Sequence, residues 1–525
     1  MTSRDRRRVP AQITDLTPIP VSVLSAADDH ADRVDGPTGE ATSRGYRRRT
    51  KRSASPTHSV MQRVTASVAR DDFWTLAERL DQLIPLASTG RPRQYRFADV
   101  LAVEQIVTMS GSQRAGVREA HDLHNWNRLR TACEHAWPDH HERRLSSQPP
   151  SRNQMQRARQ LLTGDPTILD DCREHLTHTQ VEIARTIGCF NDTGSTTHPS
   201  PDNTIAGDAT WIPGRFNTSD TTQIDTTTGE IRPRRHDPDT APFHRDGSAP
   251  GNYLVSVLTR TNAAGSRVIL DATWKPDGIS DGDVFTELAI NLKKRIPEIA
   301  AATYDMALDQ HAANTLIIHK IQPITKVRKN RHNTHTIAAL GNHTFTTQHG
   351  DTYTDSVSAV GGVPAIELII DGEQQLQPLE RVTSHYRDNT DGTATLYVIW
   401  RIPDTAPVPP KQRHATVRIR HNATDTELTT GRLRTRALRP IPPADPDFDA
   451  LFGRREDTES MHNHLKDTLH GRRARSIGLA ARTLDHLAYQ FLNGTDALLN
   501  THLEAEDWER HFGRWKPPER VRAAA

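Results

Sequence analysis

Hydrophobic positions recur at intervals of three and four between residues 66 and 195. Phe73, Leu76 and Leu80 form the first such series, and this spacing places them on one face of a helix. The segment Ser151-Arg152-Asn153-Gln154 has the S-x-x-Q form of a capping box and predicts the start of a later helix. The pattern therefore predicts an all-helical domain, which either binds DNA or serves only for packing.

Shorter apolar runs replace this pattern over residues 196–330. Three of these runs are expected to be strands. They precede a helix over 283–295, a strand over 299–304, a second helix and a final strand. This order predicts a mixed α/β sheet. We expect its acidic residues at strand ends, with Asp208 on the first strand and Asp305 after the fourth.

Residues 331–445 alternate between apolar and polar positions with a period of two, and turn residues separate the runs. This alternation predicts a β-rich insertion. Trp400 ends one run, and its ring either belongs to the core or stacks on a DNA base. Helical spacing returns over residues 446–515. The expected fold class is therefore α/β, with a mixed sheet, a β-rich insertion and an all-helical N-terminal domain.

The composition adds an expectation about the N-terminal residues. The chain has 525 residues and is 34% hydrophobic, with a mean hydropathy of −0.68, so part of it is expected to lie outside any core. Residues 1–65 show no sustained periodicity and are expected to form a disordered tail. Its basic run, residues 47–52, is either solvated or contacts phosphates.

Charge and cysteine content say more about the cellular compartment of the protein than about its function. The formal net charge is only +2, so the distribution of charge says more about a nucleic-acid partner than its total. The three cysteines, Cys133, Cys172 and Cys189, form no C-x-x-C pair, which suits a reducing compartment. No apolar run approaches the roughly 20 residues that span a bilayer. We expect a cytoplasmic protein with no membrane partner.

One helical face near the C-terminus carries a narrow cluster of ions. On a helix that turns about 100° per residue, Phe452, Arg455, Glu459 and Lys466 fall within an arc of about 60°. Met461 and its apolar neighbours point the opposite way. A carboxylate thus lies between two cations, although an Arg–Glu pair four residues apart is also a common surface ion pair.

The spacing Phe452-x2-Arg455-x3-Glu459-x6-Lys466 resembles the Tyr-x2-Arg-x3-Glu-x6-Lys signature of DDE-type cut-and-paste insertion-sequence transposases. These transposases have a ribonuclease-H-like catalytic domain. Phe452 departs from the signature because it keeps the ring of tyrosine but lacks the hydroxyl.

Two further segments resemble the same family in the same order. Asp208-Ala209-Thr210 resembles the Asp-x-Thr that ends the first strand of that fold, and Tyr304-Asp305 resembles the second aspartate, after the fourth strand. A β-rich insertion before the glutamate helix is also typical of these transposases. The resemblance covers roughly residues 200–500.

The resemblance implies a DNA transposase that cleaves phosphodiester bonds at transposon ends and transfers the strands into target DNA. Asp208, Asp305 and Glu459 would hold two Mg²⁺ or Mn²⁺ ions, with Asp208 bridging them. Two such cations stabilise the attacking and leaving oxygens of an in-line displacement, and hard cations prefer carboxylate oxygens. The implied partners are double-stranded DNA, at the ends and at the target, and a second copy of the chain assembled on DNA near the nucleoid.

Four residues are expected to contact DNA beside the cations: Arg455, Lys466, Phe452 and Thr210. Lys466 lies roughly 10 Å along the helix axis from Glu459, at about 1.5 Å per residue. We therefore expect it to neutralise a phosphate that flanks the metal ions rather than to touch the ions.

Each acid has a neighbour that competes for its role. Asp309 could replace Asp305, or it could begin the next helix. Glu456 and Asp457 are close to Glu459 in the chain and could replace it. Asp271 is a possible supporting acid. A repair or resolving nuclease of the same fold, and a transposase-derived DNA-binding protein without catalysis, are the alternative functions.

Overall fold

The computed structural model describes residues 58–84, 95–218, 220–242, 249–263, 265–329, 337–370 and 373–517. The basic run at 47–52 and nearly all of the expected tail lie outside these residues. The chain divides into two compact units. One, which we call the main unit, contains the described residues of 48–194, 199–307 and 450–525; the other, the insertion unit, contains those of 195–198 and 308–449.

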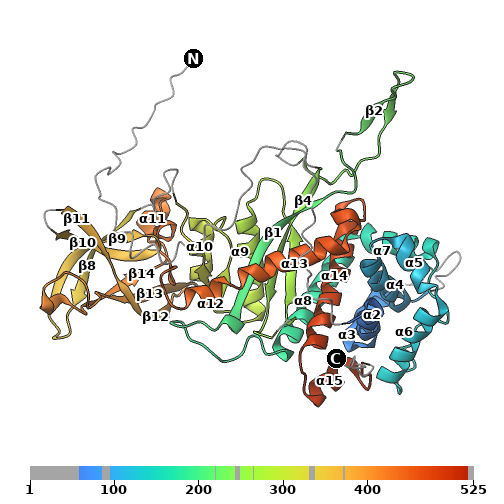
Figure 1. The fold of residues 1–525 in the computed structure, drawn as a ribbon, viewed down its shortest axis with the longest axis horizontal. Helices are drawn as coiled ribbons and strands as arrows, with labels where there is room; N and C mark the ends of the chain where they lie inside the picture. Colours follow the sequence, from blue (N-terminus) through green and yellow to red (C-terminus); the bar gives the residue numbers. More distant parts are fainter. Residues whose placement is uncertain are drawn as a thin grey trace, which may run out of the picture. The chain divides into compact units, whose positions relative to one another are not determined.

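The main unit begins with helices, as the apolar spacing predicts (Figure 1). Their bounds are α2 (Val60–Ala69), α3 (Asp71–Leu83), α4 (Phe97–Ser110), α5 (Gln113–Ala120), α6 (Leu123–Ala136), α7 (Arg152–Gly164) and α8 (Pro166–Thr186). The predicted capping box is present, since the Ser151 hydroxyl accepts a bond from the Gln154 amide and the Gln154 side chain accepts one from Ser151. The expectation of a tail through residue 65 is wrong at its end, because α2 already starts at Val60 after an N-cap at Ser59.

Next along the main unit come the strands of a mixed sheet. They are β1 (Thr204–Pro213), β4 (Gly251–Thr259), β5 (Val268–Trp274) and β6 (Ala301–Thr303), and α9 (Asp281–Arg295) lies between β5 and β6. Strands β1, β4 and β5 pair antiparallel, whereas β6 pairs parallel with β1. The strand order within the main unit is β5-β4-β1-β6, and β7 (Gln322–Ile324) lies in the chain range of the insertion unit. The α/β class with a mixed sheet and an N-terminal helical region is thus confirmed.

Two helices cover opposite faces of β1. Gly207 turns toward α9, where an added Cβ atom would lie 2.2 Å from the Phe285 ring, so only glycine allows this close approach. The alternate residues Ala206 and Ile212 pack with Met461 and Leu465 of a later helix, α13. Since side chains alternate along a strand, Asp208 belongs to the face that α13 covers.

The end of the chain returns to the main unit as helices. They are α12 (Phe448–Phe452), α13 (Arg455–Thr468), α14 (Leu479–Asn500) and α15 (Ala505–Phe512). Leu484, Leu487 and Phe491 of α14 join the hydrophobic core of the N-terminal helices. The helical region expected over 66–195 therefore shares one core with the C-terminal helices.

The insertion unit is mostly strands, as the alternation predicts. After α10 (Gln310–Ile318), seven strands form a separate sheet in the order β11-β10-β9-β8-β14-β13-β12. Their bounds are β8 (Ala338–Thr346), β9 (Thr352–Val360), β10 (Val363–Ile370), β11 (Glu373–Pro378), β12 (Glu380–Asp388), β13 (Ala394–Arg401) and β14 (Thr416–Arg420), followed by α11 (Asp425–Thr430). Trp400 is only 1% exposed and stacks on His421, so its ring belongs to the core.

Several short elements complete the described chain. They are the hairpin β2 (Thr222–Ile224) and β3 (Ile231–Pro233), and the 3₁₀ turns Pro201–Asn203, Pro410–Gln412, Arg434–Arg436 and His470–Arg472. Among the described helices, none has the length and apolar character needed to cross a membrane.

Candidate functional site

One buried tyrosine after β6 contacts one aspartate and is affected by the charges of two more. Tyr304 follows β6 and donates a hydrogen bond from its hydroxyl to Asp281 Oδ2 at 3.3 Å. Burial is the main cause of the raised pKa of Tyr304, and the negative charges of Asp281, Asp208 and Asp305 raise it further. These carboxylates are therefore close enough to act on the same hydroxyl.

Asp305 is held in an environment that opposes its charge. It lies two residues after β6, and its Oδ1 accepts a bond from the Ala307 amide at 2.7 Å. Burial raises the pKa of Asp305, and the charges of Asp281 and Asp208 add to this rise, whereas the Ala307 amide and Arg455 lower it. A cation bound here would relieve this repulsion between carboxylates.

Asp208 lies in the middle of β1 and not at its end. The expected short strand is ten residues long, and Asp208 is directly opposite Ser256 of β4. The expectation that both acids follow strand ends is thus correct for Asp305 and wrong for Asp208. The pairing with β4 continues to Pro213, which lengthens the strand beyond the apolar run visible in the sequence.

Helix α13 presents the residues of the sequence signature to these acids. Arg455 pairs with Glu459 at 2.9 Å and also acts on the charge of Asp305. Lys466 is half-buried, which lowers its pKa; nearby Arg472 lowers it further, while Asp208 raises it. His462 Nδ1 lies 3.5 Å from Asp208 Oδ2.

Glu459 therefore occupies the helix position between the residues that face the two aspartates. Arg455, one turn before it, faces Asp305, while His462 and Lys466, after it, face Asp208. The Glu459 side chain is 51% exposed and bonded to Arg455. Within the described residues, no three His, Cys, Asp or Glu side chains converge on one metal position. Asp208 and Asp305 are close enough for the charge of Asp208 to act on Asp305, and Glu459 is paired with Arg455 on α13.

The two remaining expected DNA contacts have different positions. Phe452 ends α12, and α13 begins only at Arg455, so the expectation of one continuous helix through Phe452 is wrong. Thr210 is 7% exposed, on the same face of β1 as Asp208. Lys466 lies close enough to Asp208 for this carboxylate to raise its pKa. We call Asp208, Asp281 and Asp305 the acidic centre, and Lys466 thus acts on one of its members.

The competing acids have structural partners. Asp309 caps α10 by accepting bonds from the His311 and Ala312 amides. Asp457 is paired with Arg260 at 2.5 Å. Asp271 makes a two-point ion pair with Arg173, at 2.7 and 2.9 Å. Each of these carboxylates is already neutralised or bonded locally.

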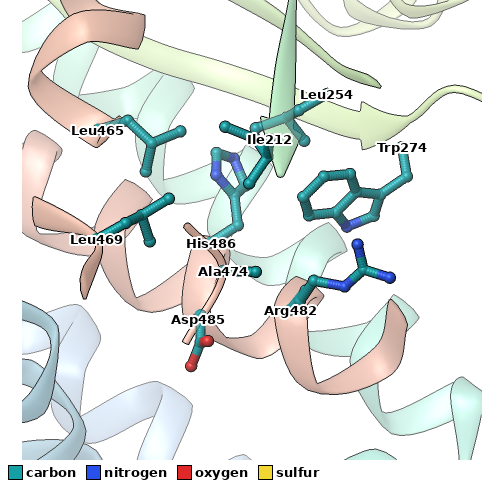
Figure 2. A pocket seen from close by; sticks show the side chains of 9 residues that line it. All are labelled: Ile212, Leu254, Trp274, Leu465, Leu469, Ala474, Arg482, Asp485 and His486. Atoms are coloured by element: carbon teal, nitrogen blue, oxygen red, sulfur yellow. The ribbon is translucent and has the colours of Figure 1, made fainter. Parts of the chain in front are cut away.

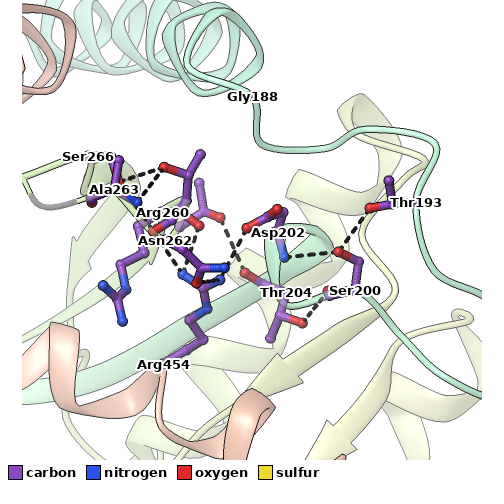
Figure 3. A network of polar contacts seen from close by, with 12 residues as sticks. Gly188, Thr193, Ser200, Asp202, Thr204, Arg260, Asn262, Ala263, Ser266 and Arg454 are labelled. Atoms are coloured by element: carbon purple, nitrogen blue, oxygen red, sulfur yellow. Dashed lines mark hydrogen bonds and ion pairs between the residues drawn. The ribbon is translucent and has the colours of Figure 1, made fainter. Parts of the chain in front are cut away.

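A buried arginine fixes the start of α13. Arg454 is 3% exposed and donates to the carbonyl oxygens of Arg260 and Thr261 and to the side chains of Asp202 and Asn262, at 3.0 to 3.1 Å (Figure 3). Burial lowers the pKa of Arg454. The network ties α13 to the turn after β4 and to the start of β1, and so sets where Glu459 lies relative to Asp208.

A small pocket lies between the sheet and helices α13 and α14. Its walls are mostly apolar, and three polar side chains, Arg482, Asp485 and His486, complete them (Figure 2). Asp485 pairs with Arg159 at 2.7 Å, and burial lowers the pKa of His486 to about 3, so this ring is neutral. The pocket therefore presents no free charge for chemistry.

Two members of the site were not found from the sequence. Asp281 begins α9 far from the other acids in the chain, and no spacing links it to them. His462 could have been found, because the same helical wheel places it within about 20° of Arg455.

No protein-family model matches the chain, and a comparison with curated proteins finds no similar sequence.

Proposed function

We propose that the chain is a DNA transposase with a ribonuclease-H-like catalytic domain. The observation that carries the proposal is the placement of Glu459 on α13 between residues that face Asp208 and Asp305. The order of elements supports it: three antiparallel strands, a helix, a strand parallel to the first, a helix and a fifth strand, with the β insertion before the glutamate helix.

The donor set suits hard divalent cations. Asp208, Asp305 and Glu459 supply carboxylate oxygens, which Mg²⁺ and Mn²⁺ prefer. Burial raises the pKa of Asp305, and the charges of Asp281 and Asp208 add to the rise. Bound divalent ions would activate the attacking water or 3′-hydroxyl and stabilise the leaving oxygen.

The protein residues have separate tasks in this account. Lys466 and Arg455 neutralise DNA phosphates beside the scissile bond. Arg455 now holds Glu459 at 2.9 Å. A phosphate arriving at Arg455 competes for that guanidinium, which frees the Glu459 carboxylate to complete the site. DNA binding and completion of the acidic centre are thereby coupled.

The partners proposed are double-stranded DNA at the element's ends and at its target, with two copies of the chain acting together on DNA in the cytoplasm. A DNA-binding protein without catalysis would need the same basic residues but not the acidic cluster. A nuclease of the same fold would cleave DNA without joining it.

The test uses the full chain and labelled duplexes carrying the DNA that flanks its gene. We expect Mg²⁺- or Mn²⁺-dependent cleavage and joining of the freed 3′-hydroxyl to plasmid DNA. Asp208→Asn, Asp305→Asn and Glu459→Gln should each reduce cleavage by more than about 100-fold, because each loses several kcal/mol of transition-state stabilisation.

Glu456→Gln is the matched control, because Glu456 is exposed on the same helix and lies three residues before Glu459. It should cleave as the wild type does. Binding without cleavage would favour the non-catalytic protein, and cleavage without joining would favour the nuclease. Cleavage that survives Asp208→Asn would overturn the proposed site.

A further inference from the structure

His462 makes two contacts that connect α13 to the first two strands of the sheet. Its side chain is 4% exposed, with Nδ1 3.5 Å from Asp208 Oδ2 and Nε2 3.3 Å from Ser256 Oγ. Ser256 is fully buried and directly opposite Asp208 in the β1–β4 register. The three side chains thus come from β1, β4 and α13 and meet on one face of the sheet.

The contacts with Asp208 and Ser256 fit one neutral tautomer of His462, with its proton on Nδ1. The serine hydroxyl can donate to Nε2, and the hydrogen of a neutral ring is then on Nδ1, facing the carboxylate. The opposite tautomer would place an Nδ1 lone pair against the carboxylate oxygen, which is repulsive. Nδ1 is buried and makes no hydrogen bond among the described residues, and the Asp208 carboxylate, 3.5 Å away, is the acceptor available to it.

We propose that His462 is a positioning residue, which orients the Asp208 carboxylate for cation binding, and that a hydrogen bond donated by Ser256 to Nε2 supports the tautomer in which it does so. The inference rests on the proposed function, because it assigns Asp208 as a ligand. If this 3.5 Å contact shortens to a hydrogen bond from Nδ1–H to Oδ2 when a cation binds, it would restrict rotation of the Asp208 carboxylate, whose oxygens would help to hold the cation. Partners of this kind commonly set the affinity of metal-ligating groups.

Lys466 cannot substitute for His462 in this role. Its ammonium is on a flexible stem and supplies charge rather than a fixed direction. It lies one turn after His462 on α13 and acts on Asp208 from a half-buried position. Removing His462 should therefore reduce cation affinity even though Lys466 still compensates the charge of Asp208.

The experiment measures Mn²⁺ affinity of the full chain without DNA, by calorimetry and by the electron paramagnetic resonance of free Mn²⁺. His462→Leu keeps the approximate volume but has no donor, and should weaken Mn²⁺ binding by about 10- to 100-fold. His462→Asn places an amide N–H near the position of Nδ1 and should keep affinity close to that of the wild type. Ser256→Ala should give an intermediate loss.

His462→Gln controls for folding, because it retains a polar side chain but places its amide near the position of Nε2. If His462→Leu fails to fold, the contrast between His462→Asn and His462→Gln decides: Asn should bind Mn²⁺ well and Gln poorly. Equal affinities for these two, or wild-type affinity in a folded His462→Leu, would overturn the positioning role.

Asp208→Asn separates this inference from the proposed function. If Asp208→Asn binds Mn²⁺ as tightly as the wild type, Asp208 is no ligand and the proposed function fails. If Asp208→Asn loses affinity while the His462 variants do not, only the positioning role fails.

Discussion

Two clusters of carboxylates, one in each unit, are compensated in different ways. In the insertion unit, Arg381 is buried and bonds Asp445 through two nitrogens, at 2.5 and 2.8 Å, and Asp447 at 2.7 Å. Burial opposes the charge of Asp447, but bonds from His198 and Arg381 outweigh it and lower its pKa. Each acid of this cluster has a cation in direct contact.

In the main unit, the acids near Tyr304 are in a different environment. Burial and the charges of Asp208, Asp281 and Asp305 raise the pKa of Tyr304, and the pKa of Asp305 itself is raised. Arg455, the cation that acts on Asp305, is paired with Glu459 instead. The comparison teaches that contacts with Arg381 and His198 stabilise a charged Asp447, whereas burial and neighbouring acids oppose the charge of Asp305, which a bound cation would favour.

The largest expected effect is in the matched cluster. Arg381→Met removes the guanidinium but keeps an apolar stem, and leaves buried Asp445 without its partner. The free energy of unfolding of this unit should fall by about 3–5 kcal/mol. Urea denaturation followed by the fluorescence of buried Trp400 measures it.

Arg401→Met is the control on the same sheet, because Arg401 pairs with Glu380 at the surface. Exposed pairs contribute at most about 1 kcal/mol. Equal losses for Arg381→Met and Arg401→Met would contradict the distinction between a buried matched cluster and a surface pair.

Divalent cations should give the next largest effect, and only in the main unit. At a Mg²⁺ concentration about 100 times its Kd, the folded state gains about 2.7 kcal/mol. The melting temperature should therefore rise with Mg²⁺ and return to its starting value with a chelator. Asp208→Asn should abolish the rise and Glu456→Gln should keep it; an equal rise in both variants would place the ions elsewhere.

Asp305→Asn should stabilise the chain slightly in the absence of metal. The raised pKa means that folding favours the protonated form, so this contribution to stability is present below the usual pKa of aspartate and is lost as pH rises through the folded value. Asparagine carries no charge and should gain on the order of 1 kcal/mol at pH 7.

The pH dependence checks the sign of that effect. Thermal melts of Asp305→Asn and wild type should differ most near neutral pH and converge in acid, where Asp305 is itself protonated. A destabilised Asp305→Asn at pH 7 without metal would show that the carboxylate is satisfied, as Asp447 is.

Lys466→Ala should have the smallest effect, and on DNA rather than on stability. If Lys466 neutralises one phosphate, the slope of log affinity against log salt should decrease in magnitude by about 1. Titration of the flanking-DNA duplex at several salt concentrations measures this. An unchanged slope would mean that Lys466 serves Asp208 alone.

The sequence predicted the elements better than it predicted their lengths and junctions. Apolar spacing located α3 and α9, and alternation located the strands of the insertion unit. It did not reveal that β1 continues to Pro213, because Ala209, Trp211 and Pro213 do not form an apolar run. It also joined Phe452 to the next helix, since a wheel drawn from sequence cannot show the turn at Gly453 and Arg454.

The same limits apply to the candidate site. The i, i+4 and i, i+7 spacings of Arg455, Glu459 and Lys466 follow from local helix geometry and were accessible in advance. The contribution of Asp281 depends on how α9 packs beside β6, and that packing needs Gly207 to admit Phe285. A contact between segments so far apart in the chain has no local signal in one sequence.

The most direct test of the account is a crystal structure of the full chain with Mn²⁺, using anomalous scattering to locate the ions. We expect two anomalous peaks about 3.5–4 Å apart, contacted by Asp208, Asp305 and Glu459, with Arg455 released from Glu459. Peaks elsewhere, or none beside Asp208 at Mn²⁺ concentrations that support cleavage, would contradict the claim that this acidic centre is a two-metal site.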